Sequence, residues 1–166
     1  MLEIQLGDLQ FEADLLNYAK SIKRTYVTAL KRSVNFFSNN VIKISPYKTG
    51  QYIASHRISF NNVDDTIYNG GKINKGTAQK IAKEQQAKIK NLSFATLADI
   101  KTIWCSNNTP QAMPLEYGLY VPKESTNVSG GYSKKAPKGV YRISAQSTED
   151  RVQEIINKAE SEMKNG

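Results

Sequence analysis

The chain has 166 residues, a mass of 18.6 kDa and a formal net charge of +8, with 39% apolar and 23% charged residues. The length and composition suit a single α+β domain over residues 1–166 and exclude a wholly disordered chain. One Cys and one His exclude a disulfide within the chain and all but exclude a Cys/His zinc site, which usually takes about four such ligands. We therefore expect no metal and no cofactor.

The first predicted element is a helix over about residues 8–40. Apolar residues recur every three or four positions, which is the spacing of one buried helix face: Phe11, Leu15, Tyr18, Ile22, Tyr26, Ala29 or Leu30, and Phe37. Asp8 suits the N-cap, and Asn39 and Asn40 mark the expected end. A helix of this length extends along or beyond a small sheet and can offer a packing face to a neighbouring subunit.

The middle of the chain alternates between short strands and basic helices. After a loop at 45–50, the pattern predicts a strand at 55–63 and a short extended segment at 66–68. A basic, mostly exposed helix is expected over 75–91, and a short helix near 94–100. A β-branched and aromatic strand follows at 101–106, and a helical turn within 112–120.

The last third begins with a long polar loop, 121–138, which carries Lys123, Lys134, Lys135 and Lys138. Loops of this length are usually functional or disordered. A strand is expected at 140–145, and a helix starts at 147–150 and runs to about 163. The order predicts an α+β fold, in which a long N-terminal helix and a C-terminal helix pack on a small antiparallel sheet.

The positive charge is uneven along the chain. Residues 71–100 and 101–145 each carry six bases and two acids, whereas 146–166 carry three bases and five acids. A basic stretch favours a polyanion or an acidic protein surface as its neighbour. A solvated basic face that aids solubility is at least as good an interpretation of the charge alone.

No segment targets the chain to a membrane. Residues 1–10 carry acids and lack the basic and apolar regions of a signal peptide. Nowhere do about 18 apolar residues run together. We expect a protein that is made in the cytosol and has no membrane partner.

Few residues suit catalysis. His56 and Cys105 both fall in predicted strands, and a reactive Cys–His pair would need the imidazole within hydrogen-bonding reach of the thiol. A buried structural Cys and a strand His are the simpler interpretation. Asp64 and Asp65 could bind a cation, but a turn explains both. Glu116, alone in an acid-poor stretch, could pair with a base across an interface or cap a helix, and we expect no catalytic residue and no enzyme.

Three short motifs occur in order along the chain. The first is Pro46-x-x-Thr49-Gly50 followed by Ser55. The second runs from Trp104 to Gly118 and contains Asn107, Pro110, Ala112, Glu116 and Gly118. The third is Ala136-Pro137-Lys138-Gly139-Val140. In this order they resemble the small tail-completion or neck proteins of long-tailed phages, a broad family that includes the minor tail protein Z of lambda-like phages. The chain departs from the family pattern at Lys48, Tyr52 and Gln111.

The resemblance implies a non-enzymatic structural protein of the virion, made in the host cytoplasm, that joins the tail to the DNA-filled head. Its implied partners are copies of itself in a ring, a hexamer in the family, together with adjacent neck and tail-terminator or tail-tube proteins. Lysines 123, 134, 135 and 138 are then assembly contacts or non-specific contacts with DNA in the lumen. The alternative is a basic nucleic-acid-binding module without enzymatic activity, with residues 72–90 as its contact helix.

Overall fold

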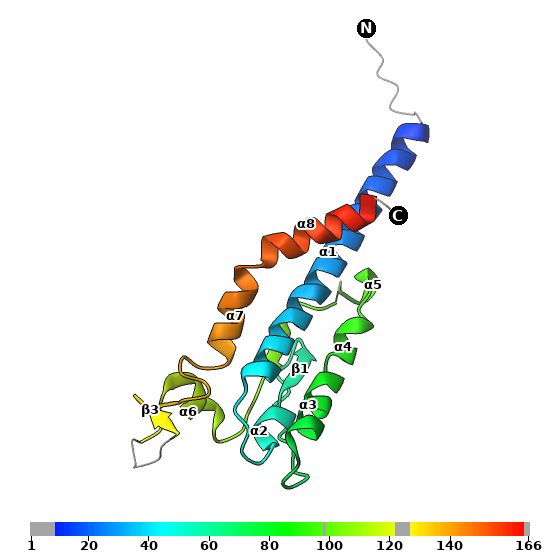
Figure 1. Ribbon diagram of the computed structural model, residues 1–166. Helices are drawn as coiled ribbons and strands as arrows, with labels where there is room; N and C mark the ends of the chain where they lie inside the picture. Colours follow the sequence, from blue (N-terminus) through cyan, green and yellow to red (C-terminus); the bar gives the residue numbers. More distant parts are fainter. Residues whose placement is uncertain (1–8, 98, 122–126, 165–166) are drawn as a thin grey trace.

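One long helix organises the molecule. The computed structural model describes residues 9–97, 99–121 and 127–164, and its first element is α1, Leu9–Ile44, with 36 residues (Figure 1). This confirms the expected helix, although Asp8 lies outside the described residues. The helix continues four residues beyond Asn40, because Val41 and Ile42 are 3% and 2% exposed and are held in the core by the helical conformation.

A small antiparallel sheet lies beside α1. Strands β1, Arg57–Phe60, and β2, Ile103–Ser106, pair with Ile58 opposite Cys105 and Phe60 opposite Ile103. Both predicted strands are confirmed, and the first is shorter than expected. A short helix, α2 (Gln51–Ala54), precedes β1, and residues 66–68 form no strand.

The basic helix predicted over 75–91 is divided in two. Helix α3 (Lys75–Glu84) begins at the N-cap Asn74, whose side chain accepts the Thr77 N–H at 2.8 Å. Helix α4 (Ala87–Lys90) follows a turn in which the Gln86 amide donates to Ser38 and Asn39 of α1. These hydrogen bonds attach the turn between α3 and α4 to α1, which accounts for the division of the predicted helix. The short helix α5 (Phe94–Leu97) follows, as expected.

The region expected to be one long loop contains regular structure. After α6, Ala112–Tyr117, the described part includes a hairpin of β3, Val128–Ser129, and β4, Tyr132–Ser133. The predicted loop residue Lys123 lies outside the described residues.

The strand expected at 140–145 is wrong. These residues begin helix α7, Tyr141–Glu149, and the signature at 147–150 lies at the end of α7 instead of starting a helix. Helix α8, Val152–Lys164, confirms the C-terminal helix and packs across α1 (Figure 1). Ala159 of α8 is fully buried, Glu162 pairs with Arg32 of α1, and the guanidinium of Arg151, just before α8, lies 5.2 Å from the centre of the Phe36 ring.

The core lies against the C-terminal half of α1. Three buried clusters line it, and their fully buried members include Ile53, Ile89 and Val140. The architecture is therefore α+β, with long N-terminal and C-terminal helices and a small antiparallel sheet. Within the described ranges, no helix combines the length and apolar character needed to cross a membrane.

The N-terminal half of α1 extends past this core (Figure 1). The face that the helical spacing predicts to be buried is open there, with Leu15, Tyr18, Ile22 and Tyr26 between 52% and 66% exposed. The expectation of burial is wrong for this half, because the elements that cover α1 pack mainly on its other half. The spacing identified an apolar face that the described residues leave largely open over this half.

Candidate functional site

Glu116 joins two of the sequence motifs. Its carboxylate accepts the backbone N–H groups of Val140, Tyr141 and Arg142 at 2.8, 2.9 and 2.8 Å. Helix α7 has no side-chain cap of its own, so Glu116 of α6 caps it from 24 positions earlier in the chain. A carboxylate at a helix N-terminus also faces the positive end of the helix dipole. The helix-capping interpretation of Glu116 is therefore confirmed.

Gly139 allows this close approach, and Gly118 allows the approach of α6 to Tyr132. Gly139 has a φ of 88°, and a Cβ there would lie 2.8 Å from Glu116 Oε1 and 3.0 Å from the Glu116 carbonyl oxygen. Gly118 ends α6 with a φ of 68°, where a Cβ would meet the Tyr132 ring at 2.4 Å. Any side chain at either position would disrupt the packing of α6.

The first motif fixes the segment that precedes α3. Gly50 has a φ of 88°, and a Cβ there would lie 2.6 Å from Ile73 Cγ1. The Thr49 carbonyl accepts the Ile73 N–H at 3.0 Å, and Ser55 Oγ accepts the Tyr68 N–H at 3.0 Å. Residues 66–68 join no strand, and the Tyr68 N–H is bonded to a side chain instead of a strand partner.

The remaining motif residues lie at the start of α6 and in the loops between the elements. Ala112 is the first residue of α6 and packs against the Val41 cluster, whereas Pro110 and Pro137 are exposed and Pro46 is half-buried. The family-motif residues thus have structural positions, and none of the described contacts gives them a chemical role.

His56 is the centre of a buried hydrogen-bonding network. Its Nε2 lies 2.8 Å from Ser45 Oγ, and its Nδ1 lies 2.8 Å from the Tyr141 hydroxyl and 3.1 Å from the Asn107 amide. Because the Ser45 hydroxyl donates to the Val41 carbonyl, Nε2 donates to Ser45, and Nδ1 accepts from Tyr141. Burial lowers the pKa of His56 to about 3, so the ring is neutral.

The Cys–His pair considered from the sequence is not formed by the described residues. Both ring nitrogens of His56 are bonded to other side chains. Cys105 packs with the Ile58 cluster, and burial raises the pKa of its thiol to about 11. A thiol with that pKa is protonated near neutral pH and is a poor nucleophile.

Asp64 is held within its turn. Its Oδ1 accepts from the Thr66 hydroxyl and N–H at 2.6 and 3.1 Å, and its Oδ2 lies 3.7 Å from Lys88 Nζ. The Thr66 hydroxyl bond, then the Thr66 N–H bond and the nearby Lys88 and Arg57 charges, lower the pKa of Asp64 against a smaller opposing effect of burial. In the described part of the chain, no three side chains of the metal-binding types come together.

Lysines are exposed on two separate surfaces. Lys134, Lys135 and Lys138 lie on and after the β3–β4 hairpin, beside α6. A second set lies along α3 and α4 around an open groove of about 600 Å³ and comprises Lys80, Lys83 and Lys90. Figure 1 shows the hairpin and the α3–α4 pair at opposite sides of the molecule. The three predicted contact lysines within the described ranges therefore do not meet the basic helix.

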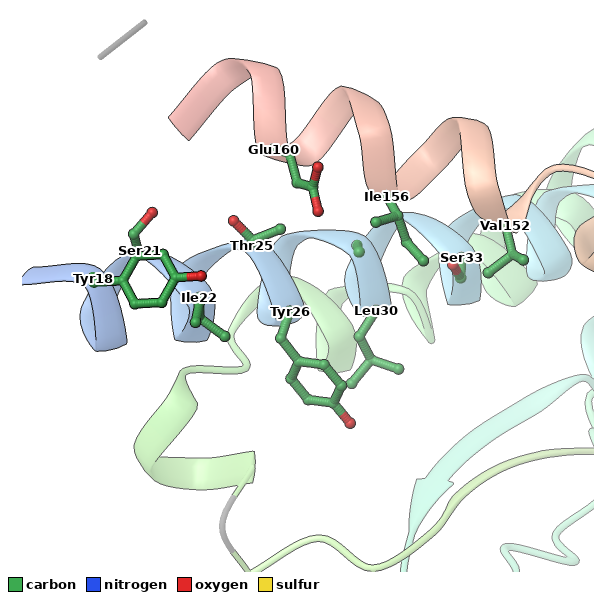
Figure 2. Close-up of a pocket in the computed structure, with 11 residues that line it drawn as sticks. Tyr18, Ser21, Ile22, Thr25, Tyr26, Leu30, Ser33, Val152, Ile156 and Glu160 are labelled. Carbon is green, nitrogen blue, oxygen red and sulfur yellow. The ribbon is translucent and has the colours of Figure 1, made fainter. Parts of the chain in front are cut away.

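An apolar groove runs between α1 and α8, and we call it the α1–α8 groove. It has a volume of about 740 Å³, and its apolar lining comes from both helices: Tyr18, Ile22, Tyr26, Leu30, Val152 and Ile156. Figure 2 shows Ile156 and Glu160 directed from α8 toward α1, while Tyr26 and Leu30 project from α1 away from α8. The helical spacing identified the α1 wall, and only the fold shows that α8 supplies the other wall.

Comparison with known proteins found no matching family model, no matching curated protein and no matching solved structure.

Proposed function

We propose that the chain is a structural subunit of the head–tail junction of a tailed phage, a tail-completion or neck protein that joins the tail to the DNA-filled head. The observation that supports this most is the meeting of the three motifs that carry the resemblance. Glu116 of the second holds the backbone that follows Gly139 of the third. His56, next to Ser55 of the first, bonds Asn107 in the second and Tyr141 beyond the third.

Contact between the motifs bears on the resemblance because each motif is short. Segments of one small domain often touch, so the structural roles of the matched residues carry more than the contact itself. Here the matched residues include a helix cap and three positive-φ glycines at close approaches, which are positions where few other residue types fit. In the proposed role, the subunit resides in the virion neck and contacts its own copies and the adjacent neck and tail proteins.

The hairpin lysines suit an assembly or lumen contact. Lys134, Lys135 and Lys138 are exposed. Non-specific contact with DNA or with an acidic subunit requires positive charge, but it requires no contact with the edges of the bases. Replacing all three with Glu should lower infectious yield in a phage that depends on this chain. The readout is the ratio of joined particles to free heads and free tails in electron micrographs.

A matched variant controls for the change in net charge. Lys72, Lys101 and Lys158 are also exposed and lie outside the hairpin, so their replacement with Glu changes the net charge equally. The control should assemble normally. Equal joining by both variants contradicts the contact role, and absence of the chain from purified particles by mass spectrometry contradicts the virion role itself.

A nucleic-acid-binding module remains the second proposal, because of the lysines along α3 and α4. These lysines line one groove on neighbouring helices, which is a geometry suited to tracking a phosphate backbone. Strong, salt-dependent binding of duplex DNA by the isolated chain favours this function, whereas cofractionation with virions and ring-shaped particles favours the first.

A further inference from the structure

A further pocket, which we call the hairpin pocket, lies between the loop before α2, helix α6 and the β3–β4 hairpin. Its volume of about 630 Å³ falls in the range of about 300–1,000 Å³ that is usual for ligand sites. Three of its lining residues, Lys48, Tyr52 and Gln111, are the positions at which the chain departs from the phage family pattern. The residues that distinguish this chain from that pattern therefore gather at one pocket, which suits a ligand particular to this chain.

Tyr52 supplies this pocket with a buried hydroxyl group. Tyr52 is 5% exposed, and its carbonyl accepts from Asn107, but its hydroxyl forms no hydrogen bond with any residue that the structure describes. A buried tyrosine hydroxyl usually has a partner. Burial, followed by the charges of Glu116 and Tyr120, raises the pKa of Tyr52, so the hydroxyl stays protonated and can donate. Since Glu116 is an anion, this position favours a neutral acceptor such as a peptide carbonyl over a phosphate or a carboxylate.

The outer edge of β3 adds a backbone donor and acceptor to the same pocket. The Lys134 N–H donates to the Asn127 carbonyl at 2.9 Å, which fixes the pairs that bond across the hairpin. In an antiparallel pair of strands the bonds join alternate opposite residues, so the N–H and C=O groups of Val128 point away from β4. Val128 lines the pocket, and no described residue bonds its backbone on that side. An extended peptide can therefore pair with β3 at Val128 by strand addition.

The lining also combines apolar and positively charged side chains. Leu115 and Tyr120 belong to one apolar cluster, and the Tyr120 N–H donates to the Gly131 carbonyl at 3.0 Å, which holds the hairpin against this wall. Lys48 and Lys135 are exposed, and neither forms an ion pair with a described residue. No acid is among the described residues that line the pocket. Acidic side chains of a ligand would complement the two lysines, and an apolar side chain would complement the wall.

We propose that the hairpin pocket binds an extended acidic peptide segment of another protein. The peptide backbone pairs with Val128, and a peptide carbonyl accepts from the Tyr52 hydroxyl. An apolar side chain of the peptide packs on Tyr120, and its acidic side chains approach Lys48 and Lys135. That the segment belongs to a neighbouring neck or tail protein rests on the proposed function, whereas the chemistry of the pocket does not.

Selection of peptides from a random displayed library on the immobilised full chain tests the class of ligand. We expect the enriched peptides to share acidic residues next to an aromatic or aliphatic residue. Fluorescence anisotropy of one labelled enriched peptide then gives its affinity for the chain in solution. The absence of enrichment, or enrichment of basic or uncharged peptides, overturns the proposal. Displacement of the labelled peptide by a lower concentration of a single-stranded oligonucleotide would assign the pocket to nucleic acid and also overturns it.

Variants of the pocket locate the bound peptide. Tyr52→Phe removes only the hydroxyl, so it should weaken peptide binding by a factor of about 3–10 and leave the midpoint of denaturant unfolding unchanged. Lys48→Ala combined with Lys135→Ala should weaken binding by a factor of about 3–10. Lys80→Ala combined with Lys83→Ala makes the same change of charge on α3, outside the pocket, and should bind as the wild type does. Equal binding by the pocket variants and this control overturns the proposal.

The proposed function is tested separately from this inference. Peptide binding at the pocket by a chain that is absent from purified virions would contradict the junction role and leave the pocket assignment intact. A chain that is present in virions and binds no acidic peptide would do the reverse.

Discussion

Among single residues, Glu116 has a large expected effect on stability for a polar side chain. It accepts three backbone N–H groups at the start of α7, and its side chain is only 15% exposed. We expect Glu116→Ala to lower the free energy of unfolding by about 2–3 kcal/mol, because it removes a charged cap and leaves N–H groups without acceptors. Denaturant unfolding measures the change. Glu84→Ala, an exposed acid at the end of α3, is the control and should change stability by about 0.5 kcal/mol or less.

His56 makes the stability of the protein depend on pH. Its folded pKa of about 3 lies below its unfolded value of 6.5, so the unfolded chain binds the proton more readily. The contribution of His56 to stability is complete above pH 6.5 and falls as the pH decreases toward 3, by up to about 1.4 kcal/mol per pH unit. Unfolding curves at about pH 7 and pH 5 avoid most carboxylate titration. His56→Gln should reduce the difference between them, and an unchanged difference would contradict this origin.

At the scale of elements, Gly50 sets how closely the segment before α3 approaches α2. Gly50→Ala introduces both left-handed strain and a clash with the Ile73 backbone and side chain, whereas Gly71→Ala introduces the strain alone, because nothing lies within 4 Å of its Cβ position. We expect a loss of about 1 kcal/mol at Gly71 and clearly more at Gly50. Thermal unfolding of the two variants measures the difference. Equal losses of stability in the two variants would show that the close contact between Gly50 and Ile73 contributes little to stability.

Local sequence patterns predicted the elements that are marked by a regular spacing of apolar residues or by the propensities of neighbouring residues. The spacing of α1, the β-branched residues of β2 and the apolar face of α8 were sufficient to locate those elements. Residues 140–145 were assigned to a strand because Val140, Tyr141 and Ile143 favour extended structure. They form a helix because the cap comes from Glu116 in α6, and the sequence pattern near α7 contains no sign of that long-range contact.

The same limit applies to the candidate site. Helical spacing identified the exposed face of α1, but spacing does not show whether a face is covered within the chain or by another chain. His56 was expected in a strand, and its network with Ser45, Asn107 and Tyr141 joins parts of the chain up to 85 positions apart. Glu116 stands alone in an acid-poor stretch, and this signal left open an ion pair across an interface and a helix cap, of which the fold shows the cap.

At the scale of the whole molecule, the distribution of charge determines how the isolated chain meets DNA. The exposed lysines are divided between the hairpin and the α3–α4 pair at opposite sides of the molecule (Figure 1). A straight duplex therefore contacts one set at a time in the isolated chain. The α3–α4 groove offers three lysines, which corresponds to a slope of about −3 for log K against log salt concentration.

With so few phosphate contacts, we expect the isolated chain to bind a short duplex weakly, with a dissociation constant of about 10⁻⁴–10⁻⁵ M near physiological salt. Fluorescence anisotropy of a labelled duplex at rising salt measures both the affinity and the slope. Replacement of Lys80, Lys83 and Lys90 with Glu should remove this binding. Replacement of the three hairpin lysines with Glu should leave most of the binding in place. Binding below about 10⁻⁶ M with a steeper slope would mean that the chain uses more of its charge at once than these two surfaces allow, and would favour the nucleic-acid module over the junction subunit.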